Sequence, residues 1–357
     1  MAPTDKNLSV VTTGKDDLLL EDREVPQPGP NEVQVAMQRV GICGSDVHFK
    51  KHGGIGEYMV KKPLILGHES SGTVSAVGPG VQNLKVGDRV AIEPGVPCRK
   101  CKLCKNGHYN LCPDSFVLSV PPDDGSLRRY HCHAADFCYK LPNHVSLDEG
   151  ALMEPLSVAI HACRRAELTL GDKVLVLGAG PIGLVTLLTA KAMGASEIAI
   201  TDILQERLDV AKKLGASSCF KIDPSLNPEE MAEKMHSVLG WRSDITLECS
   251  GVESSFHTGI YATEPGGVFQ MIGHGNPIKS FPQFVANTRE IDIRGTQRYA
   301  NTYPIALSMI ANKLVDVVPL ITHRYPLEKS VEAFNTAETF ADNAIKVMIH
   351  CDDSLTA

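Results

Sequence analysis

The hydrophobic positions of this chain follow two different patterns in its first and second halves. Up to about residue 150, short apolar runs such as 31–40, 71–78 and 88–94 are broken by glycine and proline. Such runs are typical of short strands, so we expect a mostly antiparallel β domain with its own core. We find no internal repeat and no low-complexity linker between this region and the next.

From about residue 173, apolar runs alternate with stretches that have a helical pattern. The predicted strands are 174–177, 197–201, 219–222, 245–251, 266–273 and 291–298, and the predicted helices are 184–193, 204–214 and 228–239. This alternation implies an α/β domain with a parallel, doubly wound sheet. We therefore expect a β domain over 1–155, the α/β domain over 156–297, and a segment over 298–357 that returns to pack on the first domain.

Composition and charge exclude several classes of function. Lys and Arg total 35 against 42 Asp and Glu, and the net charge of −7 argues against broad binding to nucleic acid or an anionic membrane. No run of about 18 apolar residues is present to span a bilayer, and the first residues have no secretory signal pattern. With eleven cysteines, an odd number, and no export signal, we expect reduced thiols and a cytoplasmic protein.

Four of these cysteines lie within residues 95–113, which we interpret as a lobe. Their spacing is C-x2-C-x2-C-x7-C, and thiolates at such intervals can converge on one tetrahedral zinc ion. A disulfide would need an oxidising compartment, an iron–sulfur cluster usually has other spacings, and a nucleic-acid-binding knuckle does not suit an acidic chain. We expect a structural zinc held by Cys98, Cys101, Cys104 and Cys112.

A second signal follows the strand predicted at 174–177. Residues 178–183 read GAGPIG and lead into a predicted helix, which is the context that a dinucleotide-binding G-x-G-x-x-G turn requires. The phosphates of the dinucleotide would lie at the N-terminus of that helix. Asp202 ends the next predicted strand, where a carboxylate can accept hydrogen bonds from an adenosine ribose. We expect Asp202 to favour NAD over NADP, with Arg207 as the nearest cation after it.

A third signal consists of residues that can bind zinc in the first domain. Cys43, His68 and Glu69 offer a thiolate, an imidazole and a carboxylate, and Glu154 could be a fourth ligand. We expect Pro155 to hold the backbone of Glu154 out of a helix. A single residue of these types more often has a structural role, and only the set together indicates a zinc site.

In this combination the sequence resembles the zinc-containing medium-chain alcohol dehydrogenases and, within them, the sorbitol (L-iditol) dehydrogenase group, over essentially its whole length. Where ethanol-oxidising members normally have a cysteine zinc ligand, this chain has Glu154, which points to the polyol branch. Phe49 replaces a tyrosine that is common in that branch, which affects one hydroxyl contact to substrate. The matching stretches are GICGSDVH (41–48), GHESSGTV (67–74), GDRVAIEPG (87–95), PPDDGSL (121–127), YKLP (139–142), EPLSVAIHACRR (154–165), GAGPIG (178–183) and TREIDIRG (288–295).

The resemblance implies a GroES-like catalytic domain, an NAD-binding Rossmann domain and two zinc ions per chain, one catalytic and one structural. The implied reaction is reversible oxidation of a polyol secondary alcohol, sorbitol to fructose with xylitol as a further candidate, with hydride transfer to NAD. A homotetramer is common in the family. The implied catalytic residues are Cys43, Ser45, His48, His68, Glu69 and Glu154; the substrate contacts are Phe49, Glu154, Arg298 and Tyr299; the cofactor contacts are Gly178, Gly180, Pro181, Ile182, Gly183, Asp202, Arg207, Ile272, Gly273, Gln297 and Arg298.

Two other functions stay open at this point. Similar chains oxidise xylitol, L-arabinitol or threonine, and the spacing of the motifs does not separate them. A relative that has become a structural or binding protein would have lost zinc ligands or glycines of the turn, and this chain keeps every position named above.

Overall fold

The computed structural model describes residues 6–275 and 280–352, which form two compact units. The first unit comprises Met1–Glu154, Tyr303–Lys313 and Val317–Ala357, and the second comprises Pro155–Thr302 and Leu314–Asp316. The chain thus leaves the first unit after residue 154 and returns to it after residue 302, not 297.

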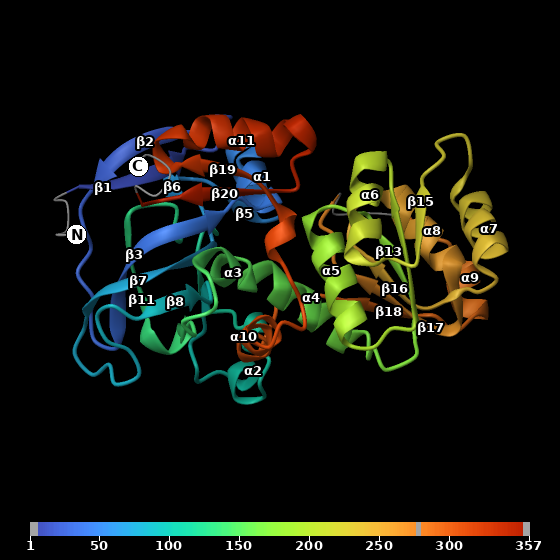
Figure 1. Cartoon of the computed structure of the whole chain (residues 1–357), viewed down its shortest axis with the longest axis horizontal. Helices are drawn as coiled ribbons and strands as arrows, with labels where there is room; N and C mark the ends of the chain where they lie inside the picture. The colour runs from blue at the N-terminus through green and yellow to red at the C-terminus, as the bar shows by residue number, and fades with distance from the viewer. Residues whose placement is uncertain (1–5, 276–279, 353–357) are drawn as a thin grey trace. The chain divides into compact units, whose positions relative to one another are not determined.

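The first unit is built around a seven-stranded sheet, shown in Figure 1, in which β3 is central. The strands run in the order β12-β8-β7-β3-β20-β19, and β11 pairs with β3 beyond this path. Neighbouring strands pair antiparallel except β19 and β20, so the predicted mostly antiparallel domain is confirmed. The seven strands are β3 (Glu32–Gly41), β7 (Glu69–Val77), β8 (Arg89–Ile92), β11 (Tyr130–Ala134), β12 (Cys138–Lys140), β19 (Ile321–Pro326) and β20 (Lys346–His350).

Shorter elements complete the first unit. The other strands are β1 (Asn7–Thr12), β2 (Leu19–Arg23), β4 (Gly54–Ile55), β5 (Tyr58–Met59), β6 (Leu64–Ile65), β9 (Gly95–Val96) and β10 (Phe116–Val117). The helices are α1 (Gly44–His52), α2 (Lys102–Lys105), α3 (Leu147–Ala151), α10 (Tyr303–Ala311) and α11 (Ser330–Thr339), with 3-10 turns at Tyr109–Leu111, Ala135–Phe137, Val318–Leu320, Leu327–Lys329 and Ala341–Asn343.

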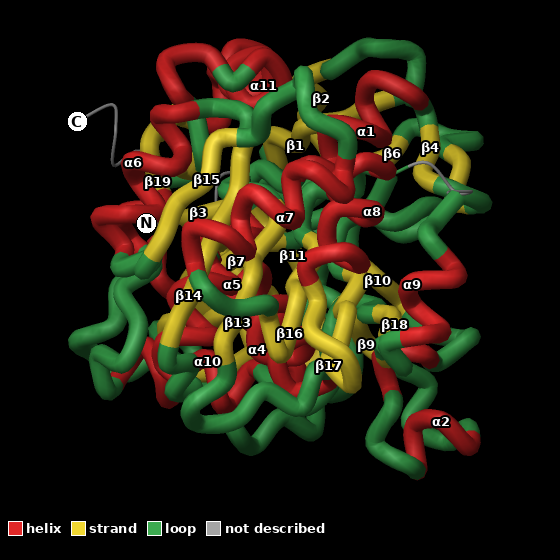
Figure 2. Tube along the Cα trace, turned by 90° about the vertical axis from the view of Figure 1, so that its right-hand side faces the viewer, coloured by secondary structure: helices red, strands yellow, loops and turns green. Residues whose placement is uncertain are grey.

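The second unit is a six-stranded, wholly parallel sheet in the order β15-β14-β13-β16-β17-β18. Figure 2 shows β14, β13, β16 and β17 side by side. The chain order reverses between β13 and β16, which confirms the doubly wound sheet and sets the edge where such folds bind ligands. The elements are β13 (Lys173–Leu177), α5 (Pro181–Ala192), β14 (Glu197–Asp202), α6 (Gln205–Leu214), β15 (Ser218–Lys221), α7 (Pro228–Leu239), β16 (Ser243–Glu248), α8 (Glu253–Ala262), β17 (Thr263–Met271), α9 (Gln283–Thr288) and β18 (Asp292–Gly295).

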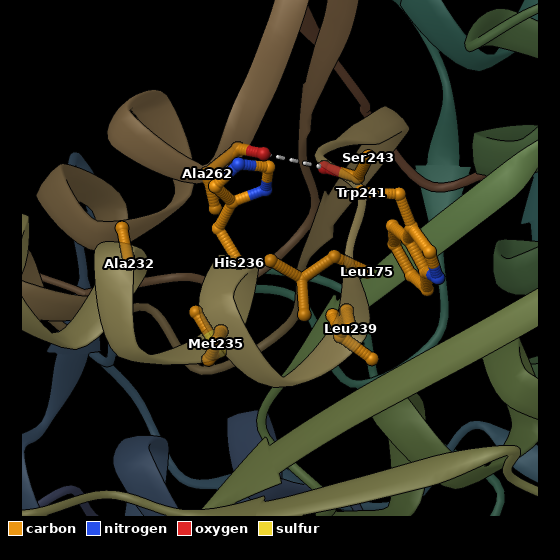
Figure 3. Close-up of a pocket in the computed structure, with 8 residues that line it drawn as sticks. All are labelled: Leu175, Ala232, Met235, His236, Leu239, Trp241, Ser243 and Ala262. Carbon is orange, nitrogen blue, oxygen red and sulfur yellow. Dashed lines mark hydrogen bonds between the residues drawn. The ribbon is translucent and has the colours of Figure 1, made fainter.

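A small pocket lies inside the second unit between α7 and the sheet (Figure 3). Its volume of about 10 Å³ is the space that one water molecule needs, and its walls are mostly apolar. It is therefore a packing gap and too small for a nucleotide or a polyol. The lining residues are Leu175, Ala232, Met235, His236, Leu239, Trp241, Ser243 and Ala262.

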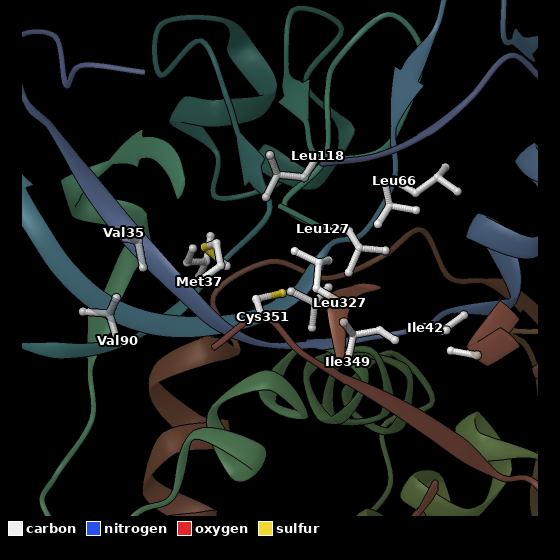
Figure 4. Packing of buried hydrophobic residues seen from close by; sticks show 14 of the residues in the cluster. Val35, Met37, Ile42, Leu66, Val90, Leu118, Leu127, Leu327, Ile349 and Cys351 are labelled. Atoms are coloured by element: carbon white, nitrogen blue, oxygen red, sulfur yellow. The ribbon is translucent and has the colours of Figure 1, made fainter. Parts of the chain in front are cut away.

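The core of the first unit joins strands that are distant in sequence (Figure 4). Val35 and Met37 of β3 belong to the same buried cluster as Leu127, Ile349 of β20 and Cys351. Burying this apolar surface stabilises the unit at roughly 25 cal/mol per Å². The segment after residue 302 therefore supplies part of this core.

Two expectations about local structure were wrong, and helices α8 and α9 were not predicted. The last strand is β18 rather than the longer 291–298. Glu154 lies in the first turn of helix α4 (Met153–Arg165), although Pro155 was expected to exclude it. A proline is tolerated in the first turn because the N–H that it lacks would have no partner within the helix. Among the described residues, no helix has the length and apolar character needed to cross a membrane.

Candidate zinc and nucleotide sites

Cys43, His68 and Glu69 meet at the carboxyl end of β3 in the first unit. Their ligand atoms all lie within 4.8 Å of one another. Cys43 is the N-cap residue of α1, and Glu69 is the first residue of β7. A thiolate, an imidazole and a carboxylate this close form a donor set that suits zinc and leaves a position for a further ligand.

Asp46 organises the loop ends around this group. Its side chain is buried, its Oδ2 accepts a hydrogen bond from Cys43 N at 3.2 Å, and its Oδ1 accepts hydrogen bonds from Ser119 Oγ at 2.7 Å and Gly67 N at 3.1 Å. The same Oδ1 lies 3.3 Å from His68 Nδ1. Burial opposes ionisation, but the His68 charge and these donors hold the pKa of Asp46 below its ordinary value. Asp46 thus fixes the His68 ring and leaves the other ring nitrogen for a metal.

Asp46 and Lys346 were not predicted from the sequence. The signal for Asp46 was present, because an acidic residue three positions after Cys43 is typical of a helix N-terminus. Lys346 Nζ contacts both Glu69 oxygens, Oε1 at 2.6 Å and Oε2 at 2.7 Å. Its sequence separation of 277 residues from Glu69 gives no local pattern to read.

Glu154 is close to this group without being part of it. The described residues whose ligand atoms converge are Cys43, His68 and Glu69, and Glu154 is not among them. Glu154 is 6% exposed and interacts electrostatically with Lys346 and with Glu93. The position of Glu154 fits a carboxylate that acts near the metal better than it fits a zinc ligand.

Ser45, His48 and Phe49, the other residues expected in the first unit, all lie on α1. Ser45 is half-buried, and His48 is exposed with its ring 5.4 Å from that of His52. Phe49 is 2% exposed and belongs to the hydrophobic core. The structure places this ring in the core, and its contact to substrate stays a prediction.

The four cysteines of the lobe converge as their spacing predicts. Their Sγ atoms all lie within 4.8 Å of one another, with separations of 3.4 Å for Cys101–Cys104 and 3.9 Å for both Cys98–Cys104 and Cys101–Cys112. A tetrahedron with Zn–S bonds of about 2.3 Å has edges of roughly 3.8 Å, whereas a disulfide needs about 2.05 Å. The lobe therefore fits a closed four-thiolate zinc site.

Glu93 connects the lobe to the main sheet. Its carboxylate is 1% exposed and accepts hydrogen bonds from Tyr109 Oη of the lobe at 2.6 Å and from Tyr139 Oη of β12 at 2.8 Å. Burial raises the pKa of Glu93 to about 7, and the nearby Glu154 and Asp136 contribute in the same direction. The residue stood in the quoted stretch GDRVAIEPG, but nothing in the sequence marked it as buried.

In the second unit, the glycine turn has the geometry that a dinucleotide needs. Gly178 has φ +96°, and a Cβ on Gly183 would collide with the Gly178 carbonyl oxygen. A Cβ on Gly180 would meet nothing closer than Arg207 Nη1 at 3.9 Å, so the backbone is open to a ligand there. Pro181 and Ile182 begin α5, whose N-terminus has no side-chain cap and can receive phosphate oxygens.

Asp202 ends β14 and lies next to this turn. Its Oδ2 accepts a hydrogen bond from Ala179 N at 2.7 Å, and its Oδ1 accepts one from Leu204 N at 2.9 Å. Arg207 Nη1 lies 3.8 Å from Oδ2. Carboxylate oxygens accept more than one hydrogen bond, so Asp202 can hold the turn and also receive a ribose hydroxyl.

The remaining predicted cofactor and substrate residues follow the last two strands of this sheet. Ile272 and Gly273 come directly after β17, and both backbone N–H groups donate to Glu248 O, at 2.9 and 2.8 Å. Gln297, Arg298 and Tyr299 lie between β18 and α10, where Arg298 has φ +44° and Tyr299 is 4% exposed. The contacts of these residues to a ligand stay predictions.

Comparison with known proteins shows that both halves of the chain match known protein families. Residues 29–143 match the alcohol dehydrogenase GroES-like domain, and residues 181–312 match the zinc-binding dehydrogenase domain. The chain is 55% identical over 347 residues to the sorbitol dehydrogenase of Bos taurus, covering 97% of each. Among solved structures, the L-idonate 5-dehydrogenase of Escherichia coli matches with a TM-score of 0.89 and 31% identity, covering 97% of this chain and 98% of that one. An alcohol dehydrogenase of Escherichia coli complexed with NADH has a TM-score of 0.90 and 27% identity, covering 97% and 100%.

Proposed function

We propose that this chain, which belongs to the zinc-containing medium-chain dehydrogenases, oxidises a secondary alcohol of a polyol with NAD as hydride acceptor. The observation that carries the proposal is the convergence of Cys43, His68 and Glu69, with Glu154 nearby, in a chain 55% identical to a sorbitol dehydrogenase. The chain keeps the zinc-binding residues that a non-catalytic relative would be free to lose. We infer sorbitol as the substrate and fructose as the product.

Each unit contributes residues that suit one of the two bound groups. Cys43, His68 and Glu69 would hold the catalytic zinc, and the N-terminus of α5 with Asp202 would hold NAD. Zinc, when bound, acts as a Lewis acid that lowers the pKa of the substrate hydroxyl. NAD supplies the acceptor for the hydride that leaves the substrate carbon.

The side chains of the first unit bind, orient and move protons. Asp46 holds the His68 ring in one orientation. Glu154, buried beside the group, accepts the proton that the substrate hydroxyl loses. Ser45 and His48 pass a proton onward to solvent, which suits the exposure of His48. In the direction of ketose reduction, these residues return the proton to the product oxygen.

Substrate choice would depend on polar groups that meet the further hydroxyls of a polyol. Arg298 can donate several hydrogen bonds to such hydroxyls, and Tyr299 adds a phenol. An alcohol without further hydroxyls gives these residues nothing to bind. We therefore expect sorbitol and xylitol to be good substrates and ethanol a poor one.

A substrate screen tests the proposed function. Purified, zinc-loaded enzyme is supplied with sorbitol, xylitol, L-arabinitol, threonine or ethanol, each with NAD and with NADP, and formation of the reduced cofactor is followed by absorbance. We expect the highest kcat/KM for sorbitol with NAD. Comparable efficiency with ethanol would exclude the polyol assignment, and highest efficiency with threonine would move the chain to another branch.

We further propose a cytoplasmic homotetramer. All eleven cysteines are free thiols, as expected for a reducing compartment. The tetramer is inferred from the family, and sedimentation equilibrium at several protein concentrations tests it. A single species at the monomer mass of 38.6 kDa would contradict it.

A further inference from the structure

A buried ion pair joins two strands of the first unit beside the proposed catalytic zinc site. Lys346 Nζ contacts both oxygens of Glu69, at 2.6 and 2.7 Å, and donates a hydrogen bond to Ile42 O at 3.0 Å. The side chains of Lys346 and Glu69 are 4% and 1% exposed. A pair so deeply buried is expensive to dehydrate and is seldom present for stability alone.

The pair depends on a glycine in the strand between its partners. β3 lies between β7 and β20, and Gly41 of β3 stands opposite Glu69 on one side and Met348 on the other. A Cβ on Gly41 would collide with Glu69 Oε2. Because Gly41 has no side chain, the carboxylate folds across β3 and meets Lys346 from the far strand.

Lys346 is also a cation in direct contact with one member of the proposed ligand set, Glu69. Its Nζ lies against both Glu69 oxygens, and Cys43 and Glu154 also act on it electrostatically. Counted as a thiolate and a carboxylate, Cys43 and Glu69 cancel the two positive charges of zinc. The ammonium of Lys346 restores one positive charge to the group.

We propose that Lys346 is a positioning residue that shares the Glu69 carboxylate with the catalytic zinc, which weakens zinc binding but keeps the metal a strong Lewis acid. This inference rests on the proposed role of Glu69 as a zinc ligand. An oxygen that donates electron density to an ammonium donates less to a metal, so the metal draws more from the substrate hydroxyl. The contact between Lys346 and Glu69 would therefore lower the affinity of the site for zinc and raise the Lewis acidity of the bound zinc.

Removal of the ammonium gives an outcome that a purely structural role does not. In Lys346→Met, the metal-free protein buries Glu69 without its cation, while zinc takes over that carboxylate in the loaded protein. We expect at least tenfold tighter zinc binding at this site, equal to about 1.4 kcal/mol, together with a lower kcat. The gap in melting temperature between zinc-loaded and metal-free protein should widen accordingly.

The measurement is chelator competition for zinc, combined with thermal melts of the loaded and metal-free chain. Cys43→Ser, which keeps only the lobe ligands, identifies the signal of the catalytic site. Lys346→Arg retains the charge and should keep the affinity and melting gap of the unmodified protein. Lys50→Met is the matched control, because Lys50 is another buried lysine, paired with Asp16 and Glu338, and should lower both melting temperatures equally.

The results separate this inference from the function on which it rests. If zinc binds at Cys43 but Lys346→Met leaves its affinity unchanged or weakens it, Lys346 is structural and the inference fails. If the Cys43→Ser variant binds as much zinc as the unmodified chain, the proposed catalytic site itself is wrong. Lys346→Gln, which removes the charge but keeps a polar group, decides the matter if the methionine variant does not fold.

Discussion

At the scale of single residues, Glu93 places a titratable carboxyl group where burial disfavours its charged form. Its carboxylate is buried at the base of the lobe, and two tyrosine hydroxyls donate hydrogen bonds to it. The pKa of Glu93 lies at about 7, above its ordinary 4.5, chiefly because of burial. The folded chain therefore holds a proton on Glu93 between these pH values, whereas the unfolded chain has released it.

This shift predicts that stability falls as the pH rises from about 4.5 to about 7. The Glu93 contribution amounts to at most about 3 kcal/mol, which is lost in full above the folded pKa. We expect Glu93→Gln to remove this contribution, so that urea unfolding of the variant depends less on pH than that of the unmodified protein. Identical pH dependence of the two proteins would show that Glu93 ionises normally.

The position of Asp202 predicts that the enzyme prefers NAD to NADP. A phosphate on the ribose of NADP would meet this buried carboxylate, which already accepts hydrogen bonds from Ala179 and Leu204. We expect a kcat/KM for NAD roughly a hundredfold above that for NADP, since each 1.4 kcal/mol is about tenfold. Asp202→Ala should narrow the ratio. Asp209→Ala, on α6 beyond the turn, is the control, and equal efficiencies in the unmodified protein would exclude this role of Asp202.

At the scale of elements, the lobe should behave as an independent, metal-dependent structure. Cys101→Ser removes one of four thiolates, and structural zinc contributes folding free energy directly. We expect a melting temperature lower by several degrees, measured by circular dichroism. The control is Cys132→Ser, because that half-buried thiol on β11 lies outside both groups of possible metal ligands. If both variants melt alike, the lobe holds no structural zinc.

Elements with a strong local pattern were predicted, and those defined by distant contacts were not. The glycine turn and β13 follow from adjacent residues, because strand, turn and helix succeed one another within a few positions. Helix α8 was missed because it packs its apolar residues against β16 and β17, and its own sequence has only a weak helical pattern. The start of helix α4 was predicted wrongly because a residue before proline usually avoids the helical conformation. In the first turn of a helix, however, a proline is tolerated.

At the scale of the whole molecule, two separate donor sets predict two zinc ions per chain. The group at Cys43 leaves a position open, whereas the four cysteines of the lobe close theirs. We expect elemental analysis of protein purified without chelators to give two zinc ions per chain. Cys43→Ser should retain one zinc and lose turnover with its fold intact. Two zinc ions per chain in the Cys43→Ser variant would contradict the assignment of Cys43 as a zinc ligand.

The candidate zinc ligands could be predicted from the sequence, but the residues that hold them could not. Cys43, His68 and Glu69 are recognisable because their chemistry is rare and their motifs resemble a known family. Lys346 becomes meaningful only once the strand register places β7 and β20 on either side of Gly41, so that the Glu69 side chain can reach it across β3. Register is set by the packing of the whole sheet, so a single stretch of sequence does not reveal it.

The glycine between Glu69 and Lys346 also bears on the order of events during synthesis. β3 and β7 leave the ribosome before the entire second unit, and β20 leaves after it. Until then Arg39–Gly41 of β3 lack the partner that β20 later supplies, although β11 already pairs with the other end of that edge. The Glu69 carboxylate likewise does not yet have Lys346 to fold toward. A nascent chain paused within the second unit would thus present a partly open sheet edge, a surface that invites pairing with other chains and that chaperones protect.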